Sequence, residues 1–162
     1  MNLLAISLNH HTASVDKREA VHLNNDEIKK FLDELKENYF SEGFILSTCN
    51  RTEIYGIPIK SELNYLHLTN FLLEKKAVVE ITDENFQKFF SCSALNHLFR
   101  VTAGIDSLLV GDNQILGQVK ESFSIAEEKG FVGFLLKRVF DHAMKVGKRA
   151  KTETLINEGA IT

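Results

Sequence analysis

A short polar segment between two apolar runs constrains the fold of this chain more than any other feature. The apolar run 43–46 leads into Ser47-Thr48-Cys49-Asn50-Arg51-Thr52-Glu53, and a second strand-like run follows until Pro58. Two short runs joined by a tight polar turn are typical of a β-hairpin, and proline ends a strand because it has no N–H to donate. The pattern predicts a hairpin whose turn carries Cys49, Asn50 and Arg51.

The cysteine in this turn has two interpretations. The positive charge of Arg51 and the free amides of the turn favour a thiolate, which attacks acyl carbonyls. Arg51 could then hold a substrate carboxylate with two hydrogen bonds, Asn50 could donate to an oxyanion, and His97 could handle a proton. Alternatively, Cys49 only fills the edge of a sheet, as small thiols often do, and His97 is an ordinary core residue.

The first part of the chain predicts the remaining elements of a ferredoxin-like α+β fold. Residues 3–8 form an apolar first strand, and a helix begins at Asn24 or Asn25. After the hairpin, residues 62–76 predict a second helix and residues 86–90 a fourth strand. This order is that of an antiparallel sheet covered on one face by two helices.

From Ser93 the pattern is helical, which predicts a helical subdomain after the sheet. Gly104 closes the first helix, a loop follows, and Asp112 is expected to cap a long second helix. Gln114 and Gln118 lie one turn apart near the start of that helix, where anions are favoured.

The last predicted helix, about residues 132–152, is amphipathic and basic. Its inward residues are expected to be Leu135, Val139, Ala143 or Val146, and Ala150, and its cationic stripe is formed by Arg138, His142, Lys145 and Arg149. Residues 137–151 carry a charge of +5, so the remainder of this chain of net charge −3 carries −8. Such a stripe is either a solvated face or a surface that follows a phosphate backbone.

Length and composition are those of an ordinary soluble protein. The 162 residues are 44% apolar and 25% charged. We divide them into a ferredoxin-like unit over residues 1–92, a helical unit over 93–156 that completes the site, and the start of a linker over 157–162. The chain has no basic, apolar leader and no apolar run of roughly 18 residues, so we expect a cytoplasmic protein with no membrane contact.

Neither the cysteines nor the histidines predict a metal site. Cys49 and Cys92 lie 43 positions apart without a CxxC motif, which favours reduced thiols. We expect Cys92, at a strand-to-helix junction, to be structural. His10 and His11 are adjacent, so in an extended segment their side chains point to opposite faces and cannot share an ion.

Five segments of the chain, taken together, resemble the catalytic domain of glutamyl-tRNA reductases. The two longest are Ser-Thr-Cys-Asn-Arg-Thr-Glu at 47–53 and Gly-Ile-Asp-Ser-Leu-Leu-Val-Gly-Asp-Asn-Gln-Ile-Leu-Gly-Gln-Val-Lys at 104–120. Shorter matches lie at 7–13, 97–101 and 148–154, in the same order as in the family. The resemblance therefore spans nearly the whole chain.

The resemblance implies a two-step reaction that opens tetrapyrrole (porphyrin) biosynthesis. In this family the cysteine attacks the ester between glutamate and the tRNA 3′ end, tRNA leaves, and NADPH reduces the thioester to glutamate-1-semialdehyde. Carried over by position, Cys49 would be the nucleophile and His97 the histidine important for activity. The residues that would bind substrate are Thr48, Cys49, Asn50, Arg51, Ser107, Asp112, Asn113, Gln114 and Gln118.

The chain departs from the family pattern in one residue and one motif. The family usually has glutamate where this chain has Asp112, whose carboxylate reaches less far. None of the nine glycines forms GxGxxG, the dinucleotide fingerprint. The NADPH domain and the helices that make the family's homodimer would lie beyond Thr162, so we interpret the chain as the catalytic domain alone.

Two other classes of function stay open. The chain could be a tRNA-binding module in which Cys49 is structural. It could also be a regulatory surface for a partner or for a small effector such as haem, although no axial-ligand motif is present. For the enzyme itself, the resemblance adds the downstream aminomutase as a possible partner.

Overall fold

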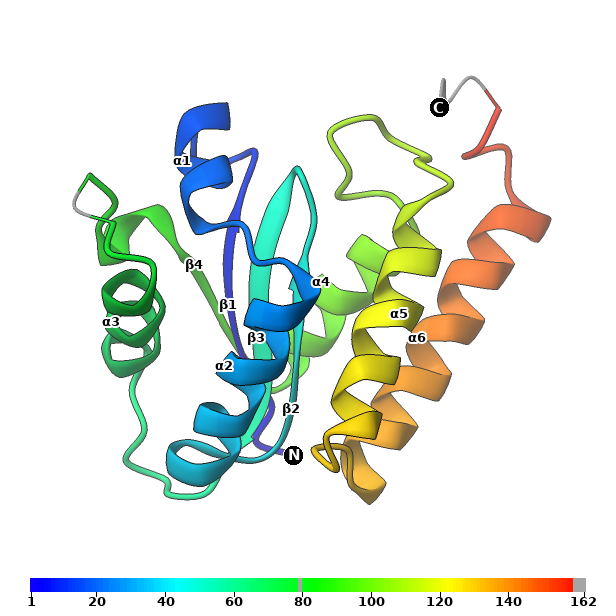
Figure 1. The fold of residues 1–162 in the computed structure, drawn as a ribbon. Coiled ribbons are helices and arrows are strands. Elements are labelled where there is room, and N and C mark those ends of the chain that lie inside the picture. Colours follow the sequence, from blue (N-terminus) through cyan, green and yellow to red (C-terminus); the bar gives the residue numbers. More distant parts are fainter. Residues whose placement is uncertain (79, 159–162) are drawn as a thin grey trace.

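A four-stranded antiparallel sheet with helices on both faces forms the protein (Figure 1). The computed structural model describes residues 1–78 and 80–158. In chain order the elements are β1 (Leu4–Asn9), α1 (Val15–Val21), α2 (Asn25–Asn38), β2 (Phe40–Ser47), β3 (Arg51–Pro58), α3 (Tyr65–Lys75), the 3₁₀ turn Asp83–Asn85, β4 (Gln87–Phe90), α4 (Cys92–Thr102), α5 (Ile115–Glu128) and α6 (Phe134–Glu153).

The strand order is β2-β3-β1-β4, and all three neighbouring pairs are antiparallel. Helix α2 contacts β2 and helix α3 contacts β1, on the same side of the sheet (Figure 1). The predicted ferredoxin-like topology is therefore confirmed. The short helix α1, between β1 and α2, was not predicted, because its seven residues show little apolar periodicity.

The hairpin of β2 and β3 is also confirmed. Ser47 pairs with Thr52, and the Thr48 N–H donates to the Arg51 carbonyl at 2.8 Å, which leaves Cys49 and Asn50 at the tip. Asn9, the last residue of β1, pairs with Arg51. The loop after β1 therefore adjoins the turn that carries the cysteine.

Helices α4 and α5 contact the second face of the sheet, and α6 packs against both of them (Figure 1). Side chains two residues apart in a strand share a face, so Arg51, Glu53 and Tyr55 point together toward these helices. The Tyr55 ring stacks on Phe44 at 4.7 Å, and Phe44 meets Phe123 of α5 at 6.1 Å. The apolar core includes residues of both faces. The division of the chain after residue 92 stays a prediction.

The inward face of α6 differs from the predicted one. Leu135 is 42% exposed, whereas Leu136 is fully buried with Val139 and Ala143. Both leucines fit helical spacing from Val139, one at four residues and one at three, so periodicity does not distinguish them. The helix also begins at Phe134, after the N-cap Gly133, rather than at about residue 132.

Two predicted helix starts are wrong by two or three residues. Asp112 does not cap α5, because its Oδ1 accepts from the Gln114 N–H at 2.8 Å in a turn before the helix, and Gln114 is the N-cap. Helix α3 starts at Tyr65 rather than at residue 62, because the Asn64 side chain caps it by accepting from the His67 N–H. Gly104 follows α4 with a φ of 78°, as predicted for a glycine that closes a helix.

We expect Gly56→Ala to destabilise the fold. A Cβ at this position would lie 2.3 Å from Cγ of Phe40, whose ring is fully buried and cannot move away. Overpacking of this kind costs about 1–3 kcal/mol, which urea unfolding would measure. The matched control is Gly117→Ala in α5, where a Cβ meets nothing within 4 Å, so a gain of up to about 1 kcal/mol is expected. Equal stability of the two variants would contradict this packing.

Candidate functional site

A pocket of about 230 Å³ lies between the hairpin tip and the start of α5. One wall is the turn, and the other is the loop after α4 together with the first turn of α5. The lining residues are Thr48, Cys49, Asn50, Arg51, Ser107, Leu108, Leu109, Asp112, Gln114, Ile115 and Gln118. Residues far apart in the sequence therefore share one small cavity, and most of the residues that line it are polar.

The pocket brings together most of the residues that the resemblance selects. Of the predicted substrate-binding residues, all but Asn113 line it. Asn113 is exposed, and its carbonyl accepts a hydrogen bond from Lys151 Nζ at 2.8 Å. His97 does not line the pocket either. The sequence did not single out the apolar lining of Leu108, Leu109 and Ile115, because nothing in its pattern separates them from loop or core residues.

Cys49 is exposed at the hairpin tip, where a bulky substrate can reach it. The backbone N–H of Asn50 is engaged, because it donates to Thr48 Oγ1 at 3.2 Å. Across the pocket, the first N–H groups of α5 have no carbonyl within their own helix to bond, and the helix dipole makes this end positive. An anionic group next to Cys49 would therefore be stabilised by the N-terminus of α5.

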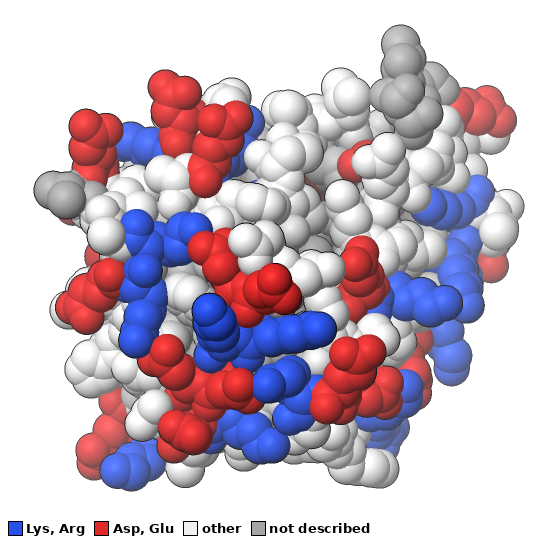
Figure 2. Space-filling model, viewed as in Figure 1, with Lys and Arg blue, Asp and Glu red and all other residues white. Residues whose placement is uncertain are grey.

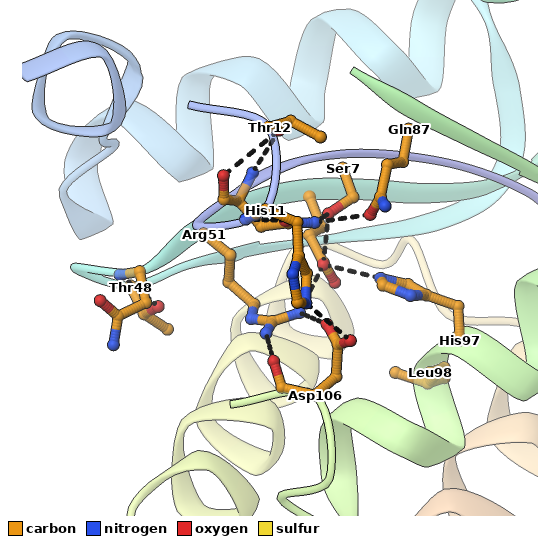
Figure 3. Close-up of polar contacts among 12 residues, drawn as sticks. Ser7, His11, Thr12, Thr48, Arg51, Gln87, His97, Leu98 and Asp106 are labelled. Carbon is orange, nitrogen blue, oxygen red and sulfur yellow. Dashed lines mark hydrogen bonds and ion pairs between the residues drawn. The ribbon is translucent and has the colours of Figure 1, made fainter. Parts of the chain in front are cut away.

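Behind the pocket, a buried network of polar groups centres on the Glu53 carboxylate (Figure 3). Its Oε1 accepts from Ser7 Oγ at 2.6 Å, from Arg51 Nη1 at 2.9 Å and from His97 Nε2 at 2.8 Å, and its Oε2 accepts from Tyr55 Oη at 2.6 Å. Glu53 is fully buried, and Arg51 is 1% exposed. Residues of β1, β3 and α4 thus meet at one carboxylate.

Arg51 also bonds to the loop that forms the opposite wall. Its Nη1 donates to Asp106 Oδ2 at 3.1 Å and its Nη2 to the Asp106 carbonyl at 2.5 Å. Two carboxylates therefore share the one guanidinium. The free cation expected beside Cys49 is partly neutralised, and a clasp on a substrate carboxylate would have to use the remaining N–H groups.

His97 lies on the far side of this network from the hairpin tip. Figure 3 shows Thr48 at the tip and His97 entering from α4 on the other side of Arg51. Its ring stacks on Phe89 with centroids 4.1 Å apart, and its side chain is 6% exposed. In this arrangement His97 orients Glu53 and does not face Cys49, so its predicted role in catalysis stays a prediction.

The network keeps Glu53 ionised. Burial alone would raise the pKa of Glu53, but the Arg51 charge and the hydrogen bonds from His97 and Ser7 outweigh it, so the pKa lies well below its usual range. Burial and the Glu53 charge together raise the pKa of Tyr55 well above its usual value. Tyr55 is therefore a neutral donor to a permanent carboxylate.

Two other kinds of site were sought in residues 1–78 and 80–158. No group of three or more His, Cys, Asp or Glu side chains there could hold a metal ion. Within the same residues, no helix has the length and apolar character needed to cross a membrane.

Comparison with known proteins gives a consistent result. Residues 6–154 match the family model described as "Glutamyl-tRNAGlu reductase, N-terminal domain". The chain is 40% identical to a glutamyl-tRNA reductase of Chlorobaculum parvum and 39% identical to one of Chlorobium limicola, in both cases over its whole length. It covers 38% and 39% of those two proteins, so it spans about two fifths of the curated relatives it matches.

A solved structure shows the same fold. Glutamyl-tRNA reductase from Methanopyrus kandleri superposes with a TM-score of 0.80 at 28% sequence identity. The match covers 99% of this chain and 37% of that one.

We expect Glu53→Gln to lower the free energy of unfolding by about 3–5 kcal/mol at pH 7, because it leaves the Arg51 charge without its buried partner. The folded pKa of Glu53 is below its unfolded value, so its stabilisation is complete above about pH 4.3 and is lost as the pH falls toward the folded pKa. The difference in free energy of unfolding between wild type and variant should therefore become smaller in acid.

Urea unfolding at several pH values measures this gap, with Glu37→Gln on the exposed face of α2 as the control. A Glu53→Gln variant within about 1 kcal/mol of wild type at pH 7 would show that the network does not depend on the ionised carboxylate.

Proposed function

The chain belongs to the family of glutamyl-tRNA reductase N-terminal domains, and from this membership we propose that it binds the glutamyl end of glutamyl-tRNA and transfers the glutamyl group to Cys49. One observation carries the proposal. The exposed thiol shares a small cavity with polar side chains from the hairpin turn, the loop after α4 and the start of α5.

The chemistry requires one covalent exchange. The Cys49 sulfur attacks the ester carbonyl, a C–S bond forms, and the C–O bond to the tRNA ribose breaks. The proton that the thiol loses ends on the departing ribose oxygen, so the products are a thioester and free tRNA. During attack, negative charge on the carbonyl oxygen is stabilised by donors of the turn and by the N-terminus of α5.

The other lining residues hold the glutamyl group. Ser107, Gln114 and Gln118 can donate hydrogen bonds to its carboxylate, and Asp112 can accept from its amino group. Thr48, Asn50 and Arg51 form the facing wall, and Asn113 supports the loop from outside the pocket. His97 acts through Glu53, which fixes the guanidinium of Arg51 at the pocket wall.

We do not assign reduction of the thioester to these residues. All three strand pairings are antiparallel, and none of the nine glycines forms GxGxxG, so these residues do not fit NADPH. In a protein as long as the relatives, the remaining three fifths would bind NADPH and supply the hydride that yields glutamate-1-semialdehyde. Homodimerisation, contact with the downstream aminomutase and a cytoplasmic location, where charged tRNA is found, are expected of that longer enzyme.

A second candidate is a tRNA-binding or regulatory module without catalysis. The exposed cationic side chains of α6 favour it, because they could hold tRNA whether or not Cys49 reacts. The two candidates differ in their dependence on the thiol.

We expect a glutamyl adduct on Cys49 after the chain is mixed with glutamyl-tRNA and quenched in acid, because a thioester survives acid long enough for intact-mass measurement. The adduct should be absent in Cys49→Ser and present in Cys92→Ser, which removes the other exposed thiol. An adduct that persists in Cys49→Ser, or bound glutamyl-tRNA that never acylates the wild-type chain, would contradict the proposal.

Without a hydride donor, the thioester can only revert or react with water. We therefore expect slow release of free glutamate from glutamyl-tRNA that depends on Cys49, and no aldehyde when NADPH is added. Amino-acid analysis and an aldehyde trap would measure the two products, and the same chain with Cys49→Ala is the control. Aldehyde production that requires NADPH would show that these residues complete the reaction.

A further inference from the structure

A second cavity, of about 590 Å³, lies between α5 and α6. Its lining includes apolar side chains such as Leu116 and Met144. Around them lie four lysines, Lys120, Lys145, Lys148 and Lys151, and one acidic residue, Asp141. We call this cavity the lysine groove.

Three of the four lysines in this groove are available for a partner. Several lysines outside the groove pair with carboxylates, as in Lys76–Glu27, Lys88–Asp83 and Lys129–Asp33, whereas others such as Lys30 and Lys60 have no such pair among the described residues. Within residues 1–78 and 80–158, no carboxylate lies within ion-pair distance of Lys120, Lys145 or Lys148. Figure 2 shows positive side chains gathered along the edge where Figure 1 draws α6. Unpaired cations around a groove complement a phosphate backbone.

Gly117 opens the same groove. It is an exposed residue inside α5, and a Cβ there would meet nothing within 4 Å. Glycine weakens a helix by up to about 1 kcal/mol relative to alanine, and no packing contact requires it here. It does leave bare backbone on the groove wall, where a ligand could approach closely.

The lysine groove and the Cys49 pocket lie on different sides of the first turns of α5. Ile115 and Gln118 of α5 line the pocket, while Leu116 and Gly117 of the same turn line the groove. A helix with its side chains is about 10–12 Å across, so the two cavities lie about one helix width apart. Lys151 further joins the groove to the pocket rim through its bond to the Asn113 carbonyl.

We propose that the lysine groove binds the phosphate backbone of the tRNA whose esterified 3′ end enters the Cys49 pocket. This inference rests on the proposed function for the identity of the nucleic acid. The small pocket recognises the glutamyl group, and the groove holds the polyanion beside it. An acidic protein surface is the competing occupant.

Binding of uncharged tRNA across a series of KCl concentrations tests the groove independently of acyl transfer. Each phosphate contact contributes about one unit to the slope of log affinity against log salt. We expect Lys145→Gln/Lys148→Gln to make that slope shallower by about two and to weaken binding at low salt. The matched control, Lys30→Gln/Lys60→Gln, removes two exposed lysines outside the groove and should keep the wild-type slope.

Gly117→Gln provides a second test that removes no charge. Its side chain should obstruct the groove and weaken tRNA binding, while the free energy of unfolding stays equal or rises. Wild-type slopes for the lysine double variant, or equal slopes for it and its control, would overturn the proposal. The proposal would also be overturned if the lysine double variant lost as much affinity for polyglutamate as for tRNA, because the groove would then be a site for an acidic protein.

Acyl transfer is measured separately. At limiting glutamyl-tRNA the lysine double variant should form the Cys49 adduct more slowly, and at saturation it should match wild type. That pattern supports the groove as a binding surface. Slower adduct formation by the variant that persists at saturating glutamyl-tRNA would contradict it. If wild type forms no adduct at all, the proposed function fails, and the salt slopes still decide the groove.

Discussion

Removing a carboxylate from water costs several kcal/mol unless nearby donors replace its hydration, and Glu53 is fully buried at the centre of the sheet. Its donors come from β1 through Ser7, from β3 through Arg51 and Tyr55, and from α4 through His97. None of them can be displaced without leaving part of the charge uncompensated. The carboxylate therefore requires the sheet and the first helix of the second layer to be in place together.

The same requirement determines the shape of the pocket. Arg51, held by Glu53, bonds to Asp106, which is 55 residues further along the chain. These bonds hold the hairpin turn and the loop after α4 against each other. An arginine that is already fixed loses little side-chain entropy when a ligand binds, so the network prepares one wall of the pocket in advance. Exposed Cys49 is left free for chemistry.

Much of the fold could be predicted from the sequence because its patterns are local. The hairpin follows from two apolar runs and a polar turn, and the strand order follows from the sequence of elements. The sequence predicted the boundaries of the helices less accurately. Asp112 has the side chain of an N-cap, but only the structure shows that it closes a turn before α5. Leu135 and Leu136 satisfy the same periodicity, and packing chooses between them.

The site was predicted in part, for a different reason. Motif resemblance selected residues of both pocket walls, although their proximity depends on contacts between distant segments. It did not show what Glu53 does, because a charged residue in a strand is interpreted as solvent-facing until something covers it. Nor did it show that Asp106, in the loop after α4, bonds to Arg51. A hint was available, since Glu53 lies directly before the apolar run of β3, the strand next to β1 at the centre of the sheet.

Electrostatics also explains why the two parts of a large anionic substrate would use different surfaces. Around Arg51 there are two carboxylates for one guanidinium, so the region behind the pocket does not attract a polyanion. The net charge of −3 does not attract a polyanion either, but at physiological salt charges act only over about 8 Å. Local charge decides instead, and residues 137–151 of α6, which packs against α5, carry +5. A chain that is acidic as a whole can therefore hold a phosphate backbone along α6 while α5 presents its positive end to the reacting group.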